Sequence, residues 1–389
     1  MKILFSHRFF WPDTAPYGTF LRRIAAHCAA AGHEVSVVSS RPSYNMTETT
    51  APARETLEGV DVARVWVFAR EKRSILLRLA NVVIYCARLF FRILRERPDV
   101  VTASTYPPVV AAMSAALAAK LVGARFVYHL QDIHPEVSRL SGSALGRFPV
   151  FGLLRWLDTL TLRMAARIVT LSDDMAETLR QRDARLAGKI RIINNLSLDE
   201  GRAPVPAPRE DGRFRVIFAG NLGRYQDLPL VAAGIARLFD RHPELELFFL
   251  GNGALERELK ESWGDHPQVR FHPFVPFDEA RAMLAESDLG IVSIMPGLSA
   301  VAYPSKLLTY QSLGLPVLAI VDPDSHIARD LAATGAGVVV RDRSEDAVAA
   351  AVEEAIAAPQ LRAKALAHAA RHDGRAVLDA WTALMDEFA

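Results

Sequence analysis

The 389-residue sequence contains only two cysteines, Cys28 and Cys86. Both lie in apolar stretches with helical spacing, and we expect them to be buried as small apolar residues. Two cysteines provide neither a disulfide framework nor a cluster spaced for a metal ion, so the sequence favours a reducing compartment and predicts no metal site. The apolar segment at residues 2–6 is too short for the core of a secretory signal peptide, because His7 and Arg8 follow it directly. We therefore expect a cytoplasmic protein.

Recognition patterns for several ligand classes are missing as well. The loop after the first expected strand has one glycine, Gly18, and so lacks the glycine-rich pattern of a dinucleotide-binding loop. Gly18 fits either a close approach of a ligand to the backbone or a simple turn before a helix from about Thr19. No helix-turn-helix, zinc-finger or aromatic RNA-binding pattern occurs, so we expect no nucleic-acid partner.

The charge is divided unevenly along the chain. Residues 1–200 hold 27 Lys and Arg against 18 Asp and Glu, whereas residues 201–389 hold 19 against 26. The halves therefore carry net charges of +9 and −7. A basic half beside an acidic half predicts an anionic partner for the first half only, either a membrane surface or a phosphate-bearing acceptor.

Short apolar segments alternate with helical patterns along the whole chain. This alternation predicts an α/β protein with two doubly wound parallel sheets. A proline-rich segment at residues 199–213 has no periodicity and reads as a linker. We expect domains at 1–198 and 214–370, and a terminal helix at 371–389 that packs back on the first domain. The expected strands are residues 2–6, 34–40, 62–67, 100–103, 125–129, 168–171, 215–219, 245–250, 269–272, 289–293, 316–321 and 337–340.

The helix expected at residues 70–97 combines eight basic residues with large apolar ones. Its longest uncharged run, residues 79–87, is nine residues, and a bilayer span needs about 20. The helix fits either an interfacial position on an anionic membrane or a crossover helix whose arginines reach solvent. Residues 147–167 could extend the same basic face. The predicted membrane contacts are Arg73, Arg78, Arg88, Phe90 and Phe91.

Two other segments indicate a site. Two histidines and two carboxylates follow an apolar strand within residues 128–136, and we predict catalytic roles for Asp132 and Glu136. At residues 302–317, Pro304 fits the first turn of a helix and Gly314 fits its end. An exposed Lys306 at that helix N-terminus would bind an anion, and we predict that it is catalytic.

Glycine-bearing turns are expected at strand ends in the second half. They occupy residues 220–223, 251–253 and 295–297. Backbone N–H groups from such turns, together with Lys306, would hold a diphosphate.

Several motifs occur in order along nearly the whole chain. They are Gly18, Ala-Gly-His-Glu-Val at 31–35, Gly-Asn-Leu-Gly at 220–223, Phe-Leu-Gly-Asn-Gly at 249–253 and Pro-Ser-Lys to Gly-Leu-Pro at 304–316. The chain thereby resembles the GT-B glycosyltransferases of family 4, and within them the WbuB-like branch that builds bacterial surface polysaccharides. The resemblance implies two Rossmann-like domains facing a cleft, with the donor mainly on the second domain and the acceptor on the first. It also implies retention of configuration without a metal.

The sequence departs from the family pattern in places. Val301 and Thr309 stand where many members carry a Glu pair, Asn221 and Gln226 replace an Arg and a Lys, and Gln131 replaces a His. The donor-binding residues that we predict are Gly18, Gly220, Asn221, Arg224, Gln226, Gly251, Asn252, Gly253, Phe274, Val275, Tyr303, Pro304, Ser305 and Lys306.

The resemblance predicts a membrane-associated transferase on the inner face of the cell membrane. We expect a UDP-sugar co-substrate, with an N-acetylated sugar, a polyprenyl-diphosphate-linked acceptor, and no bound cofactor. Two alternatives stay open. One is a catalytically silent subunit that binds a nucleotide-sugar or lipid for a partner, and the other is a UDP-sugar epimerase.

Overall fold

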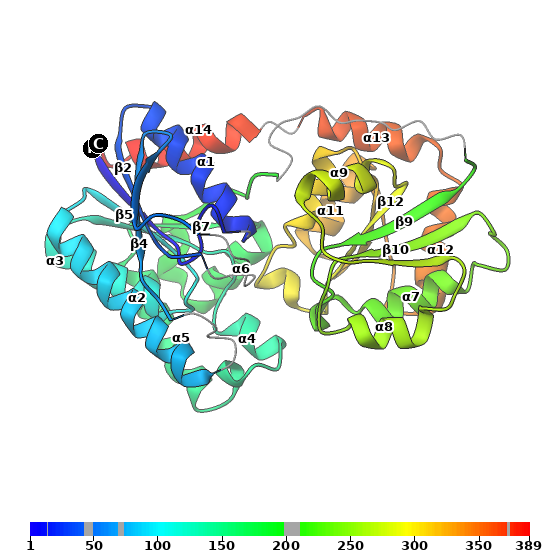
Figure 1. The fold of residues 1–389 in the computed structure, drawn as a ribbon, viewed down its shortest axis with the longest axis horizontal. Helices are drawn as coiled ribbons and strands as arrows, with labels where there is room; N and C mark the ends of the chain where they lie inside the picture. Colours follow the sequence, from blue (N-terminus) through cyan, green and yellow to red (C-terminus); the bar gives the residue numbers. More distant parts are fainter. Residues whose placement is uncertain (14, 43–49, 69–73, 198–210, 372–373) are drawn as a thin grey trace. The chain divides into compact units, whose positions relative to one another are not determined.

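The computed structural model describes residues 1–13, 15–42, 50–68, 74–197, 211–371 and 374–389. The chain divides into two compact units, and many of their helices and strands are labelled in Figure 1. Unit 1 comprises Met1–Leu198, Val301–Tyr303 and Arg375–Ala389, and unit 2 comprises Asp199–Ala300 and Pro304–Gly374. Most of the expected linker at 199–213 lies outside the described residues.

Unit 1 contains an eight-stranded sheet in the order β3-β4-β2-β1-β5-β6-β7-β8. Neighbouring strands are parallel, except that β3 and β4 are antiparallel. Inner strands are buried on both faces, as parallel strands covered by helices must be. The strands are β1 Lys2–Ser6, β2 Glu34–Ser40, β3 Arg54–Leu57, β4 Val60–Val65, β5 Val100–Ser104, β6 Arg125–His129, β7 Arg167–Thr170 and β8 Ile190–Ile192.

The last helix of the chain, α14 (Gly374–Asp386), belongs to the core of unit 1. Its Trp381 is 1% exposed and makes an edge contact with Phe5 of β1, with ring centroids 6.4 Å apart. Figure 1 shows α14 in red beside α1 in blue. The predicted return of a C-terminal helix to the first domain is confirmed. The other helices of unit 1 are α1 Pro16–Ala30, α2 Ile75–Glu96, α3 Val110–Val122, α4 Glu136–Leu140, α5 Val150–Met164 and α6 Asp173–Arg182, with 3-10 turns η2 Ala144–Gly146 and η3 Ala184–Lys189.

Helix α1 begins earlier than predicted, because Pro16 supplies a favourable first helical residue. Gly18 therefore lies in the first turn of α1 and not in the loop. A Cβ atom at Gly18 would lie 3.0 Å from the carbonyl oxygen of Phe9, so the glycine lets the helix pack closely on the preceding loop.

Unit 2 contains a six-stranded, wholly parallel sheet in the order β11-β10-β9-β12-β13-β14. The two doubly wound parallel sheets confirm the predicted α/β class. The strands are β9 Phe214–Ala219, β10 Leu245–Leu250, β11 Val269–His272, β12 Leu289–Ser293, β13 Val317–Ile320 and β14 Gly337–Val339. The helices are α7 Leu228–Ala236, α8 Glu256–Trp263, α9 Phe277–Ala285, α10 Lys306–Ser312, α11 His326–Thr334, α12 Glu345–Ile356 and α13 Gln360–Ala369, with 3-10 turns η4 Arg224–Gln226 and η5 Leu298–Ala300.

Candidate functional site

Two glycine turns pack together at the carboxyl ends of neighbouring strands in unit 2. Gly220 follows β9 and Gly251 follows β10, with φ values of +122° and +130°. A Cβ atom on Gly251 would overlap the Gly220 carbonyl oxygen, so only glycine fits there. The Gly220 N–H donates to the Leu250 carbonyl at 2.9 Å, and the Leu222 N–H donates to the Asn252 carbonyl at 3.0 Å. The two turns therefore form one backbone surface that a ligand can approach closely.

The turn after β11 joins this surface through Asn252. The Phe274 N–H donates to Asn252 Oδ1 at 2.9 Å, and the Phe274 side chain is 61% exposed. Val275 beside it is half-buried. A Cβ atom on Gly253 would overlap the Leu222 carbonyl oxygen. The structure thus brings together the predicted residues of three successive strand ends.

Lys306 reaches the same surface from the first residue of α10. Its Nζ lies 3.4 Å from the centroid of the Phe218 ring, and a Cβ atom on Gly220 would lie 3.9 Å from Nζ. The residue as a whole is half-buried, but Nζ is out of contact with solvent and has no hydrogen-bond partner in the described part of the chain. Burial lowers the pKa of Lys306 well below its usual value. The expectation of an exposed lysine is therefore wrong for its ammonium group.

The start of α10 also differs from the prediction. Ser305 is the N-cap residue and makes no capping hydrogen bond, so Pro304 precedes the helix and does not lie in its first turn. The end of the helix agrees with the prediction, since Gly314 has a φ of +63°. The Tyr310 hydroxyl oxygen accepts the Ala219 N–H at 2.9 Å, which fixes α10 against the end of β9 and so places Lys306.

Three polar residues that follow Gly220 have different surroundings. Gln226 Oε1 accepts the Gly223 N–H at 3.2 Å, so this side chain stabilises its own turn. Asn221 and Arg224 are exposed. Tyr303 is grouped with unit 1.

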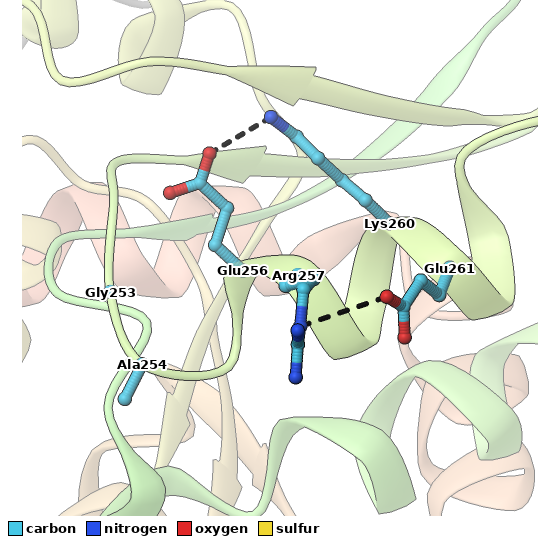
Figure 2. A pocket seen from close by; sticks show the side chains of 6 residues that line it. All are labelled: Gly253, Ala254, Glu256, Arg257, Lys260 and Glu261. Carbon is cyan, nitrogen blue, oxygen red and sulfur yellow. Dashed lines mark hydrogen bonds and ion pairs between the residues drawn. The ribbon is translucent and has the colours of Figure 1, made fainter.

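A shallow depression lies beside the Gly253 turn and is drawn in Figure 2. Its charged side chains come from α8 and pair with one another. Glu256 Oε1 lies 2.9 Å from Lys260 Nζ, and Glu261 Oε1 lies 3.7 Å from Arg257 Nε. Because these charges neutralise each other, the depression adds no unpaired charge to the candidate site.

In unit 1, His129 and Gln131 follow β6 in a buried network of neutral groups. Gln131 Nε2 donates to His129 Nε2 at 2.8 Å, so the proton of this imidazole lies on Nδ1, which is 2.8 Å from the Tyr17 hydroxyl. The Asn195 amide exchanges hydrogen bonds with Gln131 at 2.7 and 3.1 Å. Burial lowers the pKa of His129 to about 3, so this histidine is uncharged at neutral pH.

Asp132 lies next in the same loop and is held by its backbone. It pairs with Ala302 in an antiparallel bridge, and the Ile133 N–H donates to the Val301 carbonyl at 2.7 Å. Burial raises the pKa of Asp132 to about 6. The carboxyl group can therefore change its charge close to physiological pH.

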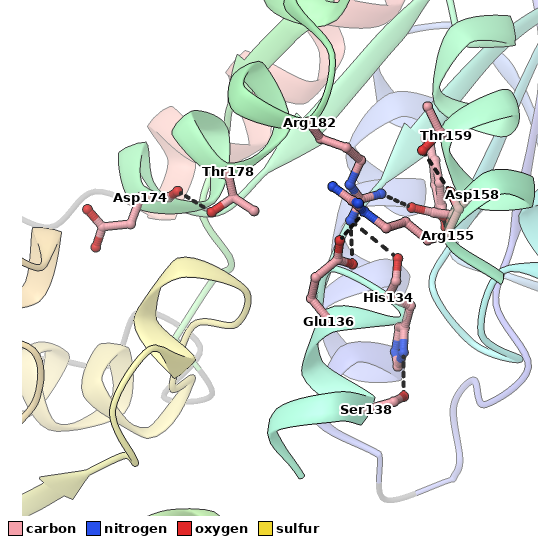
Figure 3. A network of polar contacts seen from close by, with 10 residues as sticks. His134, Glu136, Ser138, Arg155, Asp158, Thr159, Asp174, Thr178 and Arg182 are labelled. Carbon is pink, nitrogen blue, oxygen red and sulfur yellow. Dashed lines mark hydrogen bonds and ion pairs between the residues drawn. The ribbon is translucent and has the colours of Figure 1, made fainter. Parts of the chain in front are cut away.

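Glu136 has a different environment, shown in Figure 3. Its Oε2 lies 2.5 Å from Arg182 Nη2 and its Oε1 lies 3.3 Å from Arg155 Nε. Arg182 also contacts Asp158 at 2.5 Å and the His134 carbonyl oxygen at 3.4 Å. Both Glu136 oxygens are thus engaged in ion pairs that hold the loop carrying Asp132.

Sequence reasoning missed several members of these networks. Asp158 and Arg182 lie in ordinary helical patterns, and nothing in the sequence joins them to the segment after β6. Asn195 could have been found, because it follows the short apolar segment at β8 in the way that Asp132 follows β6.

Helix α2 exposes the side opposite its buried stripe. Asn81, Tyr85, Leu89 and Ile93 are buried, with the spacing of one helical face. Of the predicted contacts, Arg78 and Arg88 are exposed, Phe91 is 65% exposed and Phe90 is half-buried. Arg73 lies outside the described residues. The other large exposed apolar residues of α2 are Ile75, Leu76, Leu79 and Val83.

None of the helices in the described part of the chain has the length and apolarity needed to cross a membrane. No group of three or more His, Cys, Asp or Glu among the described residues is arranged to hold a metal ion.

Comparison with known proteins gives the family. Residues 17–195 match the model of the glycosyl transferase 4-like domain, and residues 213–358 match that of the glycosyl transferases group 1. The chain is 27% identical over 285 residues to Pseudomonas aeruginosa WbjE, which is named a probable glycosyltransferase, covering 69% of this chain and 70% of WbjE. It is 25% identical over 398 aligned positions to Escherichia coli K12 WcaI, which is named a putative colanic acid biosynthesis glycosyl transferase, covering 95% of this chain and 96% of WcaI.

The fold is also that of solved glycosyltransferase structures. Anabaena HepE in complex with UDP and glucose aligns with a TM-score of 0.71 at 17% identity, covering 99% of both chains. WaaG, a glycosyltransferase involved in lipopolysaccharide biosynthesis, aligns with a TM-score of 0.69 at 15% identity, covering 98% of this chain and 99% of WaaG. These matches confirm the predicted GT-B fold, and the chain is a glycosyltransferase of family 4, whose members retain anomeric configuration and need no metal ion.

Proposed function

We propose that this glycosyltransferase moves an N-acetylated sugar from a UDP-sugar to a polyprenyl-diphosphate-linked acceptor during assembly of a bacterial surface polysaccharide. The name of WcaI supports the polysaccharide, and the UDP bound to Anabaena HepE supports the donor nucleotide. The observation that carries the proposal is the Lys306 ammonium beside the glycine turns of unit 2.

The donor diphosphate would lie on the turns at Gly220 and Gly251. A buried ammonium group without a hydrogen-bond partner is costly, and an anion beside Lys306 would remove that cost. The Gly220 and Gly251 N–H groups already donate to the Leu250 and His272 carbonyl oxygens at 2.9 Å, so these turns would contribute a close backbone approach and Lys306 would meet the charge that develops on the leaving diphosphate. The remaining predicted donor contacts of unit 2 are Asn221, Arg224, Gln226, Asn252, Gly253, Phe274, Val275, Pro304 and Ser305, and those of unit 1 are Gly18 and Tyr303.

The acceptor side of the proposal rests on Asp132. With a pKa of about 6 its carboxylate is mostly ionised at neutral pH and can accept a hydrogen bond from the acceptor hydroxyl. Glu136 would act through the loop, because both of its oxygens pair with arginines. Retention of configuration without a placed nucleophile would then need the donor phosphate to accept the proton of the acceptor hydroxyl.

The lipid-linked acceptor implies a peripheral position on the inner face of the cell membrane. Helix α2 supports this position, because it presents Arg78 and Arg88 together with exposed apolar side chains such as Phe91. The other face of α2 is buried, so the helix can serve as a crossover between strands and expose these side chains at the same time.

Single-turnover release of UDP from candidate UDP-sugars, with and without a polyprenyl-diphosphate-linked acceptor, tests the proposal. Release that needs the acceptor supports transfer. Conversion of the sugar without an acceptor would indicate an epimerase. Binding without either reaction would indicate a silent subunit, which Val301 and Thr309 at the positions of the common Glu pair would favour.

A further inference from the structure

A second exposed apolar area lies on α5 and the residues just before it. Phe148 is 90% exposed, Leu153 58% and Trp156 61%. Val150 and Leu160 are exposed by 42% and 36%. Single exposed apolar residues are common on proteins, but a group of large ones on one element marks an interaction surface. We call these five residues the α5 surface.

The inner side of α5 fixes which residues face outward. Its buried residues are Asp158, Thr161 and Leu162. Asp158 is paired with Arg182 at 2.5 Å and accepts the Tyr128 hydroxyl at 3.0 Å. Turning the helix to hide the α5 surface would expose Leu162 and break these buried contacts. The apolar stripe is therefore a fixed feature of the fold.

The rim of the α5 surface is basic. Residues 139–163 contain four arginines and a single acidic residue, the buried Asp158. Arg139 lies over the Phe151 ring at 5.0 Å, and Arg147 is exposed without an ion-pair partner among the described residues. No exposed carboxylate occurs in this segment to repel an anionic partner.

Helix α3 connects the α5 surface with α2. It packs against α2 on one side and α5 on the other. Leu117 and Leu121 of α3 are 44% and 69% exposed, and its only charged residue is Lys120. Three neighbouring helices of unit 1 thus expose apolar side chains among basic ones.

We propose that the α5 surface binds a lipid bilayer that contains anionic headgroups, with Leu153 and Trp156 in its interfacial region. Basic residues around large apolar and aromatic ones are the composition of an interfacial helix. The sequence predicted the membrane contacts on α2, with residues 147–167 as an extension of the same basic face. The α5 surface adds two exposed aromatic residues, Phe148 at 90% and Trp156 at 61%, to the 65% exposed Phe91 of α2. The proposal concerns unit 1 alone and does not depend on the transfer reaction.

Flotation of the full-length protein with phosphatidylcholine vesicles, with or without phosphatidylglycerol, tests this surface. We expect binding to the anionic vesicles at low salt, and a remainder at 1 M NaCl because apolar contacts are not screened. The double variant Leu153→Gln and Trp156→Gln should bind about 100-fold more weakly, as loss of two buried apolar side chains predicts. Arg147→Glu should weaken binding about tenfold at low salt only.

Matched variants separate this surface from general effects. Ile192→Thr changes an exposed apolar residue of unit 1 outside the helical layer, and Arg341→Glu reverses an exposed charge in unit 2. Both should bind vesicles like the wild type. Brominated lipids should quench the tryptophan fluorescence of the wild type and of the control variant Trp263→Phe. They should quench the fluorescence of Trp156→Phe much less, although this variant should still float with the vesicles.

Three results would overturn the proposal. They are failure of the wild type to float with anionic vesicles at low salt, unchanged binding of the double variant, and equal quenching with and without Trp156. A concentration-dependent dimer that the double variant abolishes would show instead that a second copy covers the surface. UDP-sugar binding, measured on the same samples, should be unchanged in every variant. Loss of vesicle binding can therefore be distinguished from a failure of the proposed donor site.

Discussion

At the scale of single residues, Lys306 combines a predicted role with an unpredicted environment. The sequence indicated the lysine, because it follows Pro304-Ser305 before a helix, but it could not show that Nζ lies against Phe218. That contact depends on the packing of α10 on β9, which joins residues far apart in the chain. Glu136 is the opposite case. Its neighbours in the sequence indicated a catalytic role, whereas its ion pairs with Arg155 and Arg182 hold the loop after β6 in place.

The first prediction concerns the cost and use of the Lys306 charge. Burial depresses the pKa of Lys306, so the unfolded chain binds more protons than the folded one. Lys306 therefore lowers the stability of the folded protein increasingly as the pH falls below the ordinary pKa of a lysine. Lys306→Met should therefore raise the Tm of the ligand-free protein at neutral pH. The same variant should weaken UDP-sugar binding by about two orders of magnitude or more.

Calorimetric melting with and without UDP-sugar measures both effects. Lys306→Arg is the matched control, because it keeps a positive charge and should retain part of the affinity. A Lys306→Met variant that is stabilised by UDP-sugar as strongly as the wild type would refute the assignment.

The second prediction concerns Asp132. Its ionised form should be required, so turnover should fall as the pH drops through about 6. Asp132→Asn should lower turnover about 100-fold, remove this limb of the pH profile, and leave UDP affinity nearly unchanged. A parallel loss of UDP affinity would place Asp132 on the donor side or in a structural role. Steady-state kinetics from pH 5 to pH 8 with a UDP titration at each pH would distinguish these outcomes.

At the scale of elements, most strands were predictable, whereas the starts of α1 and α10 were not. Apolar runs give parallel strands directly, and β6, β10, β11 and β12 have the predicted bounds. Strand β3 (Arg54–Leu57) was missed because its short, polar sequence gains its conformation by pairing with β4. Helix α1 starts at Pro16 because proline favours a first turn, a signal that the more prominent Gly18 obscured.

The third prediction concerns the contact between α5, α6 and the loop after β6. Removing the Arg182 guanidinium leaves the fully buried Asp158 carboxylate without its charged partner. Arg182→Met should therefore destabilise unit 1 by about 3–5 kcal/mol. Burial raises the pKa of Asp158 to about 6, although Arg182 opposes this shift. Without Arg182 the pKa should rise further, so the variant should lose stability as the pH rises from 5 to 8.

Urea unfolding at several pH values checks this prediction. The double variant Arg182→Met with Asp158→Asn removes the unpaired buried charge and should recover much of the loss, with little remaining pH dependence. If the single and double variants are equally unstable, packing of the Arg182 side chain matters more than its charge.

At the scale of the whole molecule, the sequence predicted two sheets and the return of the last helix. It did so because the alternation of apolar segments and helical patterns restarts after the proline-rich segment. The last helical segments are also long enough to reach back to the first domain. The apolar residues outside the core were less predictable. In α2 both the buried stripe and the exposed side are apolar, so composition alone could not separate a membrane contact from a crossover helix.

The last prediction uses the division of charge along the chain. Residues 1–200 carry a net charge of +9, and α2 contributes the exposed Arg78 and Arg88. Each basic residue near an anionic surface contributes about 1 kcal/mol, and salt screens this contribution. Arg78→Glu with Arg88→Glu should therefore slow transfer to a lipid-linked acceptor in anionic vesicles by at least about tenfold. Transfer to a short soluble acceptor should change little, because neither arginine belongs to the proposed site, and Arg341→Glu should affect neither reaction. In 1 M NaCl the wild type and the double variant should transfer sugar to the lipid-linked acceptor in vesicles at similar rates. Equal slowing with both acceptors would mean that these arginines support the fold or the catalytic site and that the basic half of the chain does not recruit the membrane through α2.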